Sequence, residues 1–285
     1  MDLKILEWNI NQRRGRKDSN REDIPLWIPE EIINQKPDIA ILTEVVTDRN
    51  WEKEIEPRLS QHYNVSVSDN TNSQHEQNDV AILIKKEGLE ETSKDNSWES
   101  QPDKCIPDYL RVDCKIKGHE LTIIGARLHI LDSNMRKKEF EFILKQTIEI
   151  KNPILIAGDF NNYRRGAINL QPEWNIDVLV DIATDFGFTC HTPRGSSTKS
   201  ECPYCNFGNK PICLTNQFAE DHFLTKNFYQ NRIFKLCEYD RNFILKHGEE
   251  YGKETDFNGD LYPNPDHAML KGILHLEEKH RNDNC

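Results

Sequence analysis

Short, almost wholly apolar runs separated by polar turns are the feature that most limits how this chain can fold. Each run is rich in Ile, Leu and Val. Runs of this length and composition are typical of β-strands that are buried on both faces. The predicted strands are Leu3–Ile10, Asp38–Leu42, Val80–Ile84, Leu121–Ile124, Ile154–Ala157 and Ala268–Leu276.

Amphipathic helices are predicted between these strands. The clearest is Asn134–Lys151, because its apolar side chains recur with the spacing of one helical face. Asp132 or Ser133 can cap its start, and Pro153 follows its end. The apolar face consists of Phe140, Ile143, Leu144, Thr147 and Ile148.

The remaining segments complete the predicted organisation. Two further helices are expected at Pro29–Gln35 and Asn50–Gln61, and the polar stretches Asp69–Asn78 and Glu90–Pro107 are expected to be exposed loops. Strands and helices mixed without strict alternation indicate α/β layers around one continuous core. We therefore expect a single domain over residues 1–285.

The charge of the chain limits the classes of partner. Asp and Glu number 48 against 37 Lys and Arg, a formal net charge of -11. This balance argues against a protein that coats long nucleic acid nonspecifically, because such binding depends on positive surface. No apolar stretch is long enough for a membrane helix, and Met1–Lys4 leads directly into a strand without a secretory signal. We therefore expect a cytoplasmic protein with no membrane contact, and we see no sign of an obligate protein partner.

Polar side chains recur at or just beyond the ends of the apolar runs. At a single strand end they usually mark a turn or a helix cap, but a sheet gathers adjacent strand ends into one crevice. Carboxylate and amide oxygens gathered there suit Mg²⁺, Mn²⁺ or Ca²⁺, and a histidine exchanges protons near neutral pH. This combination suits metal-assisted hydrolysis of a phosphate ester. The residues are Asn9, Asn11, Glu44, Asp159, Asn161, Asp266 and His267.

Short motifs around these residues follow one another along the chain. They are Trp8–Asn11, Asp38–Glu44, Arg127–His129, Gly158–Asn161, Glu220–Phe223 and Pro265–His267. In this order they resemble the endonuclease/exonuclease/phosphatase superfamily, which includes pancreatic-type deoxyribonucleases and apurinic endonucleases. The resemblance implies an α/β fold of two mixed β-sheets packed face to face with helices outside, a four-layer sandwich of the deoxyribonuclease type.

The resemblance also implies a site for Mg²⁺ or Mn²⁺. Glu44 matches the principal metal ligand of the family, with Asn9 and Asn11 beside it. Asn11 could instead simply cap a turn. Asp266 resembles a further carboxylate that binds the metal or orients a histidine.

Catalytic roles are implied in the same way. Asp159 resembles the residue that orients or deprotonates the attacking water, and Asn161 resembles a donor to the phosphate. His267 resembles the group that contacts the scissile phosphate, and Asp221 matches a carboxylate that pairs with a catalytic histidine. His129 follows the strand-end histidine of the family, although it could also be a half-buried strand residue without chemistry.

Basic residues gather just after two of the predicted strand ends. Arg13 and Arg14 follow the first strand motif, and Arg164 and Arg165 follow the Gly158–Asn161 motif. Each pair could be a solvated loop, but their corresponding places favour contacts to a polyanionic substrate. A further substrate-side arginine, Arg111, is implied by the resemblance.

The cysteines gather in one place that the family resemblance does not explain. Cys190, Cys202, Cys205 and Cys213 could close a structural Zn²⁺ site, and His191 could replace Cys190. A redox pair or unpaired reduced thiols are the alternatives. We expect a Cys-rich insertion loop at about residues 190–213, bordering the substrate crevice.

Together these features favour a divalent-metal-dependent nuclease that hydrolyses phosphodiester bonds of nucleic acid, with DNA favoured over RNA. A phosphatase of phosphoinositides or small phosphate esters is an alternative with the same chemistry. A catalytically inactive binding module is the alternative from another class. Joint retention of the candidate site residues argues against that last alternative; they are Glu44, Asp159, Asn161, Asp266 and His267.

Replacing Arg164 and Arg165 by Ala should weaken substrate binding and flatten its dependence on salt. The reason is that each arginine bound to a phosphate releases counterions. Its loss therefore reduces the steepness with which log K falls against log salt by about 1. Binding to an oligonucleotide across a salt series measures both effects. An unchanged slope would contradict the assignment.

Overall fold

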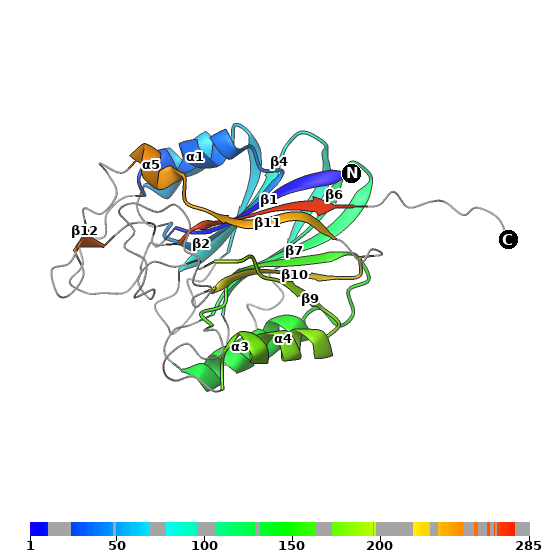
Figure 1. Ribbon diagram of the computed structural model, residues 1–285. Coiled ribbons are helices and arrows are strands. Elements are labelled where there is room, and N and C mark those ends of the chain that lie inside the picture. Colours follow the sequence, from blue (N-terminus) through cyan, green and yellow to red (C-terminus); the bar gives the residue numbers. More distant parts are fainter. Residues whose placement is uncertain are drawn as a thin grey trace.

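The computed structural model is an α/β sandwich of two six-stranded mixed sheets that pack face to face, with helices on their outer faces (Figure 1). This is the fold class that the sequence predicts. The described residues are 1–10, 24–47, 50–68, 78–95, 107–128, 132–162, 173–195, 197, 219–228, 233–247, 254–255, 261–262, 265 and 267–276.

Sheet A contains the first and the last of the described strands, β1 and β14. Its strands are β1 (Asp2–Asn9), β2 (Ile39–Val45), β3 (Tyr63–Val67), β4 (Asp79–Lys85), β11 (Phe234–Asp240) and β14 (Met269–His275). They lie in the order β11-β14-β1-β2-β4-β3. Neighbours β1 and β2 run parallel, and the other pairs run antiparallel.

Sheet B is built from the middle of the chain. Its strands are β5 (Leu89–Asp95), β6 (Asp108–Ile116), β7 (His119–Arg127), β8 (Ile154–Asp159), β9 (Thr189–His191) and β10 (Asp221–Lys226). They lie in the order β5-β6-β7-β8-β10-β9, with β7 and β8 parallel. Each sheet therefore holds one parallel strand pair. A separate ribbon pairs β12 (Glu254–Thr255) with β13 (Leu261–Tyr262).

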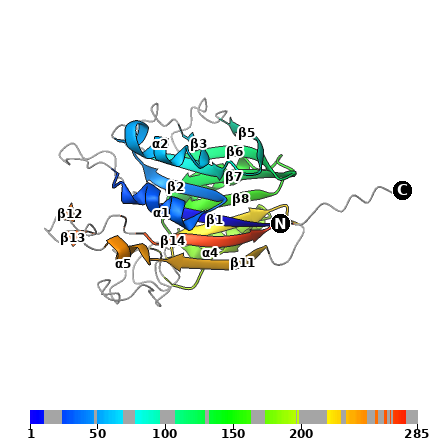
Figure 2. The same ribbon diagram turned by 90° about the horizontal axis from the view of Figure 1, so that it is seen from above.

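Helices cover the outer face of each sheet. They are α1 (Trp27–Gln35), α2 (Glu56–Leu59) after the π-helical turn η1 (Trp51–Ile55), α3 (Ser133–Lys145), α4 (Ile176–Asp185) and α5 (Phe243–His247). Helices α1 and α5 lie over sheet A, and α3 and α4 lie under sheet B (Figure 1). Figure 2 shows α1 and α2 lying across the outside of sheet A. Among the described residues, no helix is long and apolar enough to cross a membrane.

Three apolar clusters hold these layers together. The cluster between the sheets joins residues of β1, β2 and β4 to residues of β6, β7 and β8. The other two pack Trp8 against Trp27 on the outside of sheet A, and Phe140 against Phe160 on the outside of sheet B. Both faces of the central strands are thereby buried, which explains their continuous apolar sequences. Each fully buried Leu or Ile contributes about 1.5–3 kcal/mol to folding.

Helix α3 starts where the sequence predicts and ends earlier. Asp132 caps it, because its carboxylate accepts hydrogen bonds from the backbone N–H groups of Asn134 and Met135. The helix ends at Lys145 and not at Lys151, so that part of the prediction was wrong. The cause is local: the Thr147 side chain and backbone N–H both donate to the Leu144 carbonyl, which tightens the last turn.

Part of the segment predicted as the loop Glu90–Pro107 is a strand. Residues Leu89–Asp95 form β5, which pairs antiparallel with β6 at the edge of sheet B. Most of its side chains are exposed, so its sequence contains no apolar run that would predict a strand. Most of the predicted loop Asp69–Asn78 lies outside the described residues; Asn78 is described and buried.

Gly125 allows the two sheets to approach each other. A Cβ atom on Gly125 would lie 2.6 Å from Cγ1 of Val80 and 2.8 Å from Cγ2 of Ile41. Both neighbours belong to sheet A, whereas Gly125 belongs to sheet B. A side chain at this position would therefore push the sheets apart.

Replacing Gly125 by Ala should lower the free energy of unfolding by about 1–3 kcal/mol, because it overpacks the inter-sheet core. Urea unfolding measures the change. The control Ser93→Ala, at an exposed position of β5, should stay within about 0.5 kcal/mol of the wild type. Equal stabilities for Gly125→Ala and Ser93→Ala would show that the sheets can separate without penalty.

Candidate active site

The carboxyl ends of the two parallel strand pairs meet at one edge of the sandwich. Asn9 and Glu44 stand at the carboxyl ends of β1 and β2 in sheet A. Arg127 and Asp159 lie opposite each other at the ends of β7 and β8 in sheet B. Asp221 begins the antiparallel strand β10 opposite Asp159. Polar groups from both sheets are therefore brought to the same place.

Asp159 is the centre of this cluster and is only 1% exposed. Its Oδ2 accepts a hydrogen bond from Asn9 Nδ2 at 2.9 Å, and this bond crosses from sheet A to sheet B. Its Oδ1 accepts from the backbone N–H of Asn161 at 2.9 Å. Asn161 has a positive φ of 45° and donates from Nδ2 to the Leu128 carbonyl at 2.6 Å. The carboxylate is thus held in one orientation.

Gly158 is required directly before Asp159 because the neighbouring strand passes very close. A Cβ atom on Gly158 would lie 1.8 Å from the backbone oxygen of Ala126. Any other residue would force β7 and β8 apart and displace Asp159. The glycine of the Gly158–Asn161 motif is therefore required both by this close packing and by its φ of 155°.

His267 and Asp221 form a buried pair beside Asp159. His267 Nδ1 lies 2.9 Å from Asp221 Oδ2. The pair is fixed from behind, because Trp8 Nε1 donates to the His267 carbonyl at 3.2 Å and the Tyr239 hydroxyl donates to the Asp221 carbonyl at 2.7 Å. With Nδ1 turned to the carboxylate, the Nε2 edge of the imidazole is directed away from Asp221.

Arg127 is a member of this cluster that the sequence analysis did not assign. Its guanidinium lies 2.8 Å from Glu44 Oε1, 3.2 Å from Asp108 Oδ2 and 3.9 Å from Asp159 Oδ2. Burial lowers the pKa of Arg127, but the carboxylates, Glu44 first, outweigh this and raise it. Burial raises the pKa of Asp159 to about 7, helped by Asp221 and Glu44 and opposed by His267 and Arg127.

Glu7 is a second unassigned member and is fully buried. Neither of its carboxyl oxygens makes a hydrogen bond of good geometry within the described part of the chain. Burial raises the pKa of Glu7 well above its ordinary value, and the charges of Asp221 and Asp159 act in the same direction while that of His267 opposes them. A carboxyl group on the inward face of β1 could have been found by continuing the alternation of Leu3, Ile5, Glu7 and Asn9.

His222 lies on the other face of β10 from Asp221. Its Nε2 is 2.8 Å from Asn162 Oδ1, and its Nδ1 is 2.8 Å from the Thr192 hydroxyl. Its ring stacks on Phe160. His222 is therefore directed away from the cluster that contains Asp221.

Arg111 is not brought to the cluster. It lies on β6 with its guanidinium 2.9 Å from Asp95 and 2.8 Å from Asp113. Its neighbours Leu110 and Val112 face the inter-sheet core, so Arg111 points to the opposite face of sheet B.

Cys190 lies on β9 with its thiol 3.6 Å from the Thr192 hydroxyl.

Several predicted residues lie outside the described part of the chain, so their roles stay predictions. They are the catalytic candidate His129, the metal-ligand candidates Asn11 and Asp266, the arginines Arg13, Arg14, Arg164 and Arg165, and the zinc candidates Cys202, Cys205 and Cys213.

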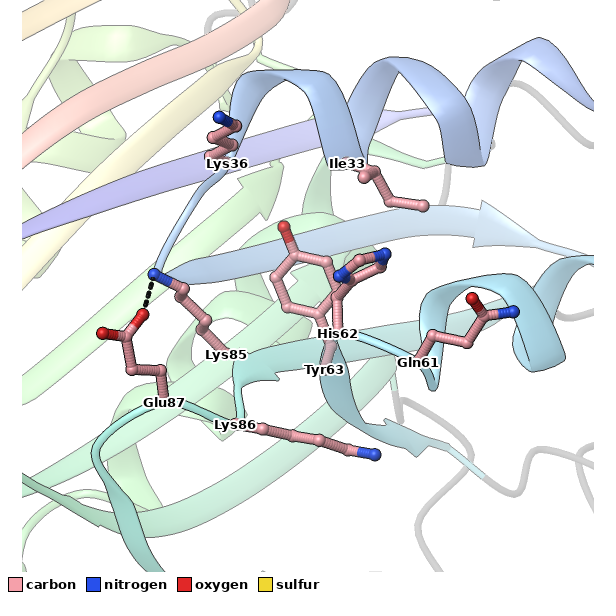
Figure 3. Close-up of a pocket in the computed structure, with 8 residues that line it drawn as sticks. All are labelled: Ile33, Lys36, Gln61, His62, Tyr63, Lys85, Lys86 and Glu87. Atoms are coloured by element: carbon pink, nitrogen blue, oxygen red, sulfur yellow. Dashed lines mark ion pairs between the residues drawn. The ribbon is translucent and has the colours of Figure 1, made fainter.

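A cavity of about 400 Å³ lies elsewhere, at the end of sheet A opposite Glu44 (Figure 3). Its lysines are mostly engaged: Lys85 forms an ion pair with Glu87 at 2.6 Å, and Lys86 donates to the Ser60 carbonyl. The cavity is lined by Ile33, Lys36, Gln61, His62, Tyr63, Lys85, Lys86 and Glu87. It is therefore separate from the candidate active site.

Comparison with known families identifies the family of the chain. A model described as the Endonuclease/Exonuclease/phosphatase family matches residues 6–230. The chain belongs to this family. No curated protein sequence matches the chain.

Solved structures show the same fold. An endonuclease/exonuclease/phosphatase from Bacteroides vulgatus has a TM-score of 0.62 and 15% identity, covering 97% of this chain and 100% of that chain. TDP2 of D. rerio, humanized by 14 mutations, has a TM-score of 0.59 and 15% identity over 96% of this chain and 99% of that chain. D. rerio TDP2 complexed with single strand DNA product has a TM-score of 0.58 and 14% identity, with the same coverage. At these identities the likeness concerns the fold alone.

The donor set of this family member fits a hard divalent cation. Mg²⁺ is commonly bound by one or two protein carboxylates, water and substrate phosphates. Glu44, with the amide of Asn9 at the neighbouring strand end, offers oxygen donors of this kind. Within the described ranges, no three His, Cys, Asp or Glu side chains form a metal-binding group. Glu44 and Asn9 are therefore the described residues that fit such an ion.

Replacing Glu7 by Gln should make stability less dependent on pH. Above the ordinary pKa of 4.5 the unfolded chain loses the Glu7 proton, whereas the folded protein retains it. The wild type therefore loses stability as pH rises above this value, by up to about 1.4 kcal/mol per pH unit, until the raised folded pKa is reached. Glu7→Gln lacks this loss, so its advantage should grow between pH 4 and pH 8.

Urea unfolding at several pH values measures this difference. The matched control is Glu91→Gln, the same substitution at an exposed position of β5, which should follow the wild type at every pH. A constant difference between Glu7→Gln and the wild type from pH 4 to pH 8 would mean that Glu7 is not held protonated.

Proposed function

We propose that this protein is a divalent-metal-dependent nuclease that hydrolyses phosphodiester bonds of nucleic acid. The observation that carries the proposal is the buried Asp221–His267 pair, with its 2.9 Å contact, beside the hydrogen-bonded carboxylate of Asp159. A histidine oriented by a carboxylate next to a second carboxylate is an arrangement suited to proton transfer. Membership of the family supports the phosphodiester bond as the bond that is cleaved.

Each side chain has a distinct task in this proposal. Asp159 accepts the proton of the attacking water, which is consistent with a pKa of about 7 in the buried site. Asp221 keeps the His267 ring in place and stabilises its protonated form, so that His267 can stabilise negative charge on the scissile phosphate. Asn161, whose backbone N–H is bound to Asp159, stands beside the position proposed for the phosphate.

Glu44 and Asn9 are the described residues that would hold the cation, with Asn11 and Asp266 as further candidates. When bound, a divalent cation neutralises charge on the phosphate oxygens. Arg127 already supplies one fixed positive charge next to Glu44. Mn²⁺ would fit the same oxygen donors.

Nucleic acid is the substrate class that we favour. TDP2 of D. rerio, a protein of similar fold, has a crystal structure in complex with single strand DNA product. The arginine pairs that follow Asn11 and Asn161 in the sequence would contact flanking phosphates. These two arguments favour DNA as the first substrate to test.

The test is incubation of the purified protein with plasmid DNA, single-stranded RNA and inositol phosphates, each with Mg²⁺ or with EDTA. Cleavage of a polynucleotide that requires Mg²⁺ supports the proposal. Release of phosphate from inositol phosphates alone would make the protein a phosphatase. If none is cleaved, the protein is a binding module that retains the fold.

Replacing His267 by Ala or Asp221 by Asn should lower kcat by about 10²–10³-fold, since each change removes the imidazole that stabilises charge on the phosphate or the carboxylate that holds this imidazole. Initial rates at saturating substrate measure the effect. His62→Ala is the control: His62 is exposed at the far end of sheet A, and its removal should leave kcat unchanged. Wild-type rates for both site variants would exclude this pair from catalysis.

A further inference from the structure

Arg127 contacts carboxylates from three strands in two sheets. It leaves the end of β7 and is 7% exposed. Glu44 reaches it from β2 in sheet A, whereas Asp108 and Asp159 reach it from β6 and β8 in sheet B. The guanidinium therefore lies at the junction of the two sheets, on the same edge as the candidate active site.

The three contacts use three different nitrogen atoms. Nη2 lies 2.8 Å from Glu44 Oε1, Nη1 lies 3.2 Å from Asp108 Oδ2, and Nε lies 3.9 Å from Asp159 Oδ2. A planar guanidinium offers donors in a fixed fork, so its orientation is determined once two partners are in place. A lysine ammonium is a point charge and would not set the orientation in this way.

Asp108 anchors the guanidinium of Arg127 to sheet B. It is fully buried and lies directly opposite Arg127 in the register of β6 and β7. Because both residues belong to sheet B, their pairing fixes the guanidinium relative to that sheet. The remaining contact, to Glu44, then fixes a side chain of sheet A relative to sheet B.

Glu44 needs such a contact. Its φ is 55°, a conformation that costs a non-glycine residue about 1 kcal/mol or more, and the pairing of β2 with β4 is irregular between Leu42 and Val45. The backbone at Glu44 is therefore held by its surroundings and not by regular strand pairing. Arg127 is the described cation that binds the Glu44 side chain.

We propose that Arg127, anchored by Asp108, is a positioning residue that orients the Glu44 carboxylate for the metal ion. The inference rests on the proposed function, in which Glu44 is the principal metal ligand. It adds two residues, Arg127 and Asp108, to the machinery of the site. Arg127 acts through Glu44 and does not itself contact the scissile phosphate.

Direct binding of Mn²⁺ to the free protein, measured by electron paramagnetic resonance titration, tests this without relying on activity. Asp108→Asn and Arg127→Lys should each bind Mn²⁺ at least ten-fold more weakly than the wild type. In activity assays, the Mn²⁺ concentration for half-maximal rate should rise in both variants, and excess Mn²⁺ should restore much of kcat. A purely structural role would change stability without this shift in metal affinity.

Two matched controls separate positioning from general effects. Asp113→Asn is the same substitution on the same strand, but it removes a partner of Arg111. Lys246→Met removes a cation of α5 that lies 2.9 Å from the buried carboxylate of Glu31 on α1. Both controls should bind Mn²⁺ like the wild type, even where thermal unfolding shows that they are less stable.

The outcomes are distinguishable. If the wild type binds Mn²⁺ and the folded variants bind it equally well, the positioning role is overturned while the proposed function stands. If Arg127→Lys does not fold, the Mn²⁺ affinity of Asp108→Asn alone decides whether the positioning role stands. If the wild type binds no Mn²⁺ and cleaves no substrate, the proposed function fails and the inference fails with it.

Discussion

The hydrogen bond from Asn9 to Asp159 is the contact on which the arrangement of the site depends, because it joins the two sheets at their polar edge. Both residues end strands whose inward-facing side chains are packed in the inter-sheet core. The distance between the sheets therefore sets the distance between the functional groups. Gly125, deep in that core, permits the close approach that lets this bond form. Packing between the sheets thus controls the geometry of the site.

Concentrating carboxylates in a buried place is electrostatically unfavourable, and the structure shows how it is tolerated. Glu44, Asp159 and Asp221 are all nearly inaccessible to water, where an unpaired charge is strongly destabilising. Arg127 and His267 supply the positive partners within the described residues. Burial, helped by Asp221 and Glu44, nevertheless raises the pKa of Asp159 more than His267 and Arg127 lower it. The divalent cation proposed for this site would add positive charge beside the same oxygen atoms.

The sequence predicts the layers and the strand-end residues of this protein better than it predicts their partners. Continuous apolar runs marked the central strands, whereas the exposed edge strand β5 carries no such signal. Asp159 follows an apolar run and His267 precedes one, both at visible motif positions, so they could be identified as candidates. Glu7 lies within β1, where a lone polar residue looks like an interruption, whereas Arg127 ends β7. Their roles depend on which side chain faces them from the other sheet. That pairing cannot be predicted from the spacing of residues along the sequence.

Strain at the strand ends completes the physical account. Glu44 and Asn161 both adopt positive φ values without being glycine. Each is held by side-chain contacts: Arg127 binds the carboxylate of Glu44, and the Asn161 amide donates to the Leu128 carbonyl. Such conformations persist only where the surroundings determine them. The chain turns sharply at these residues and so directs consecutive polar groups into one small volume. Strands that ended without these turns would send the same side chains to alternate faces of the sheet, and a cluster of this kind could not form.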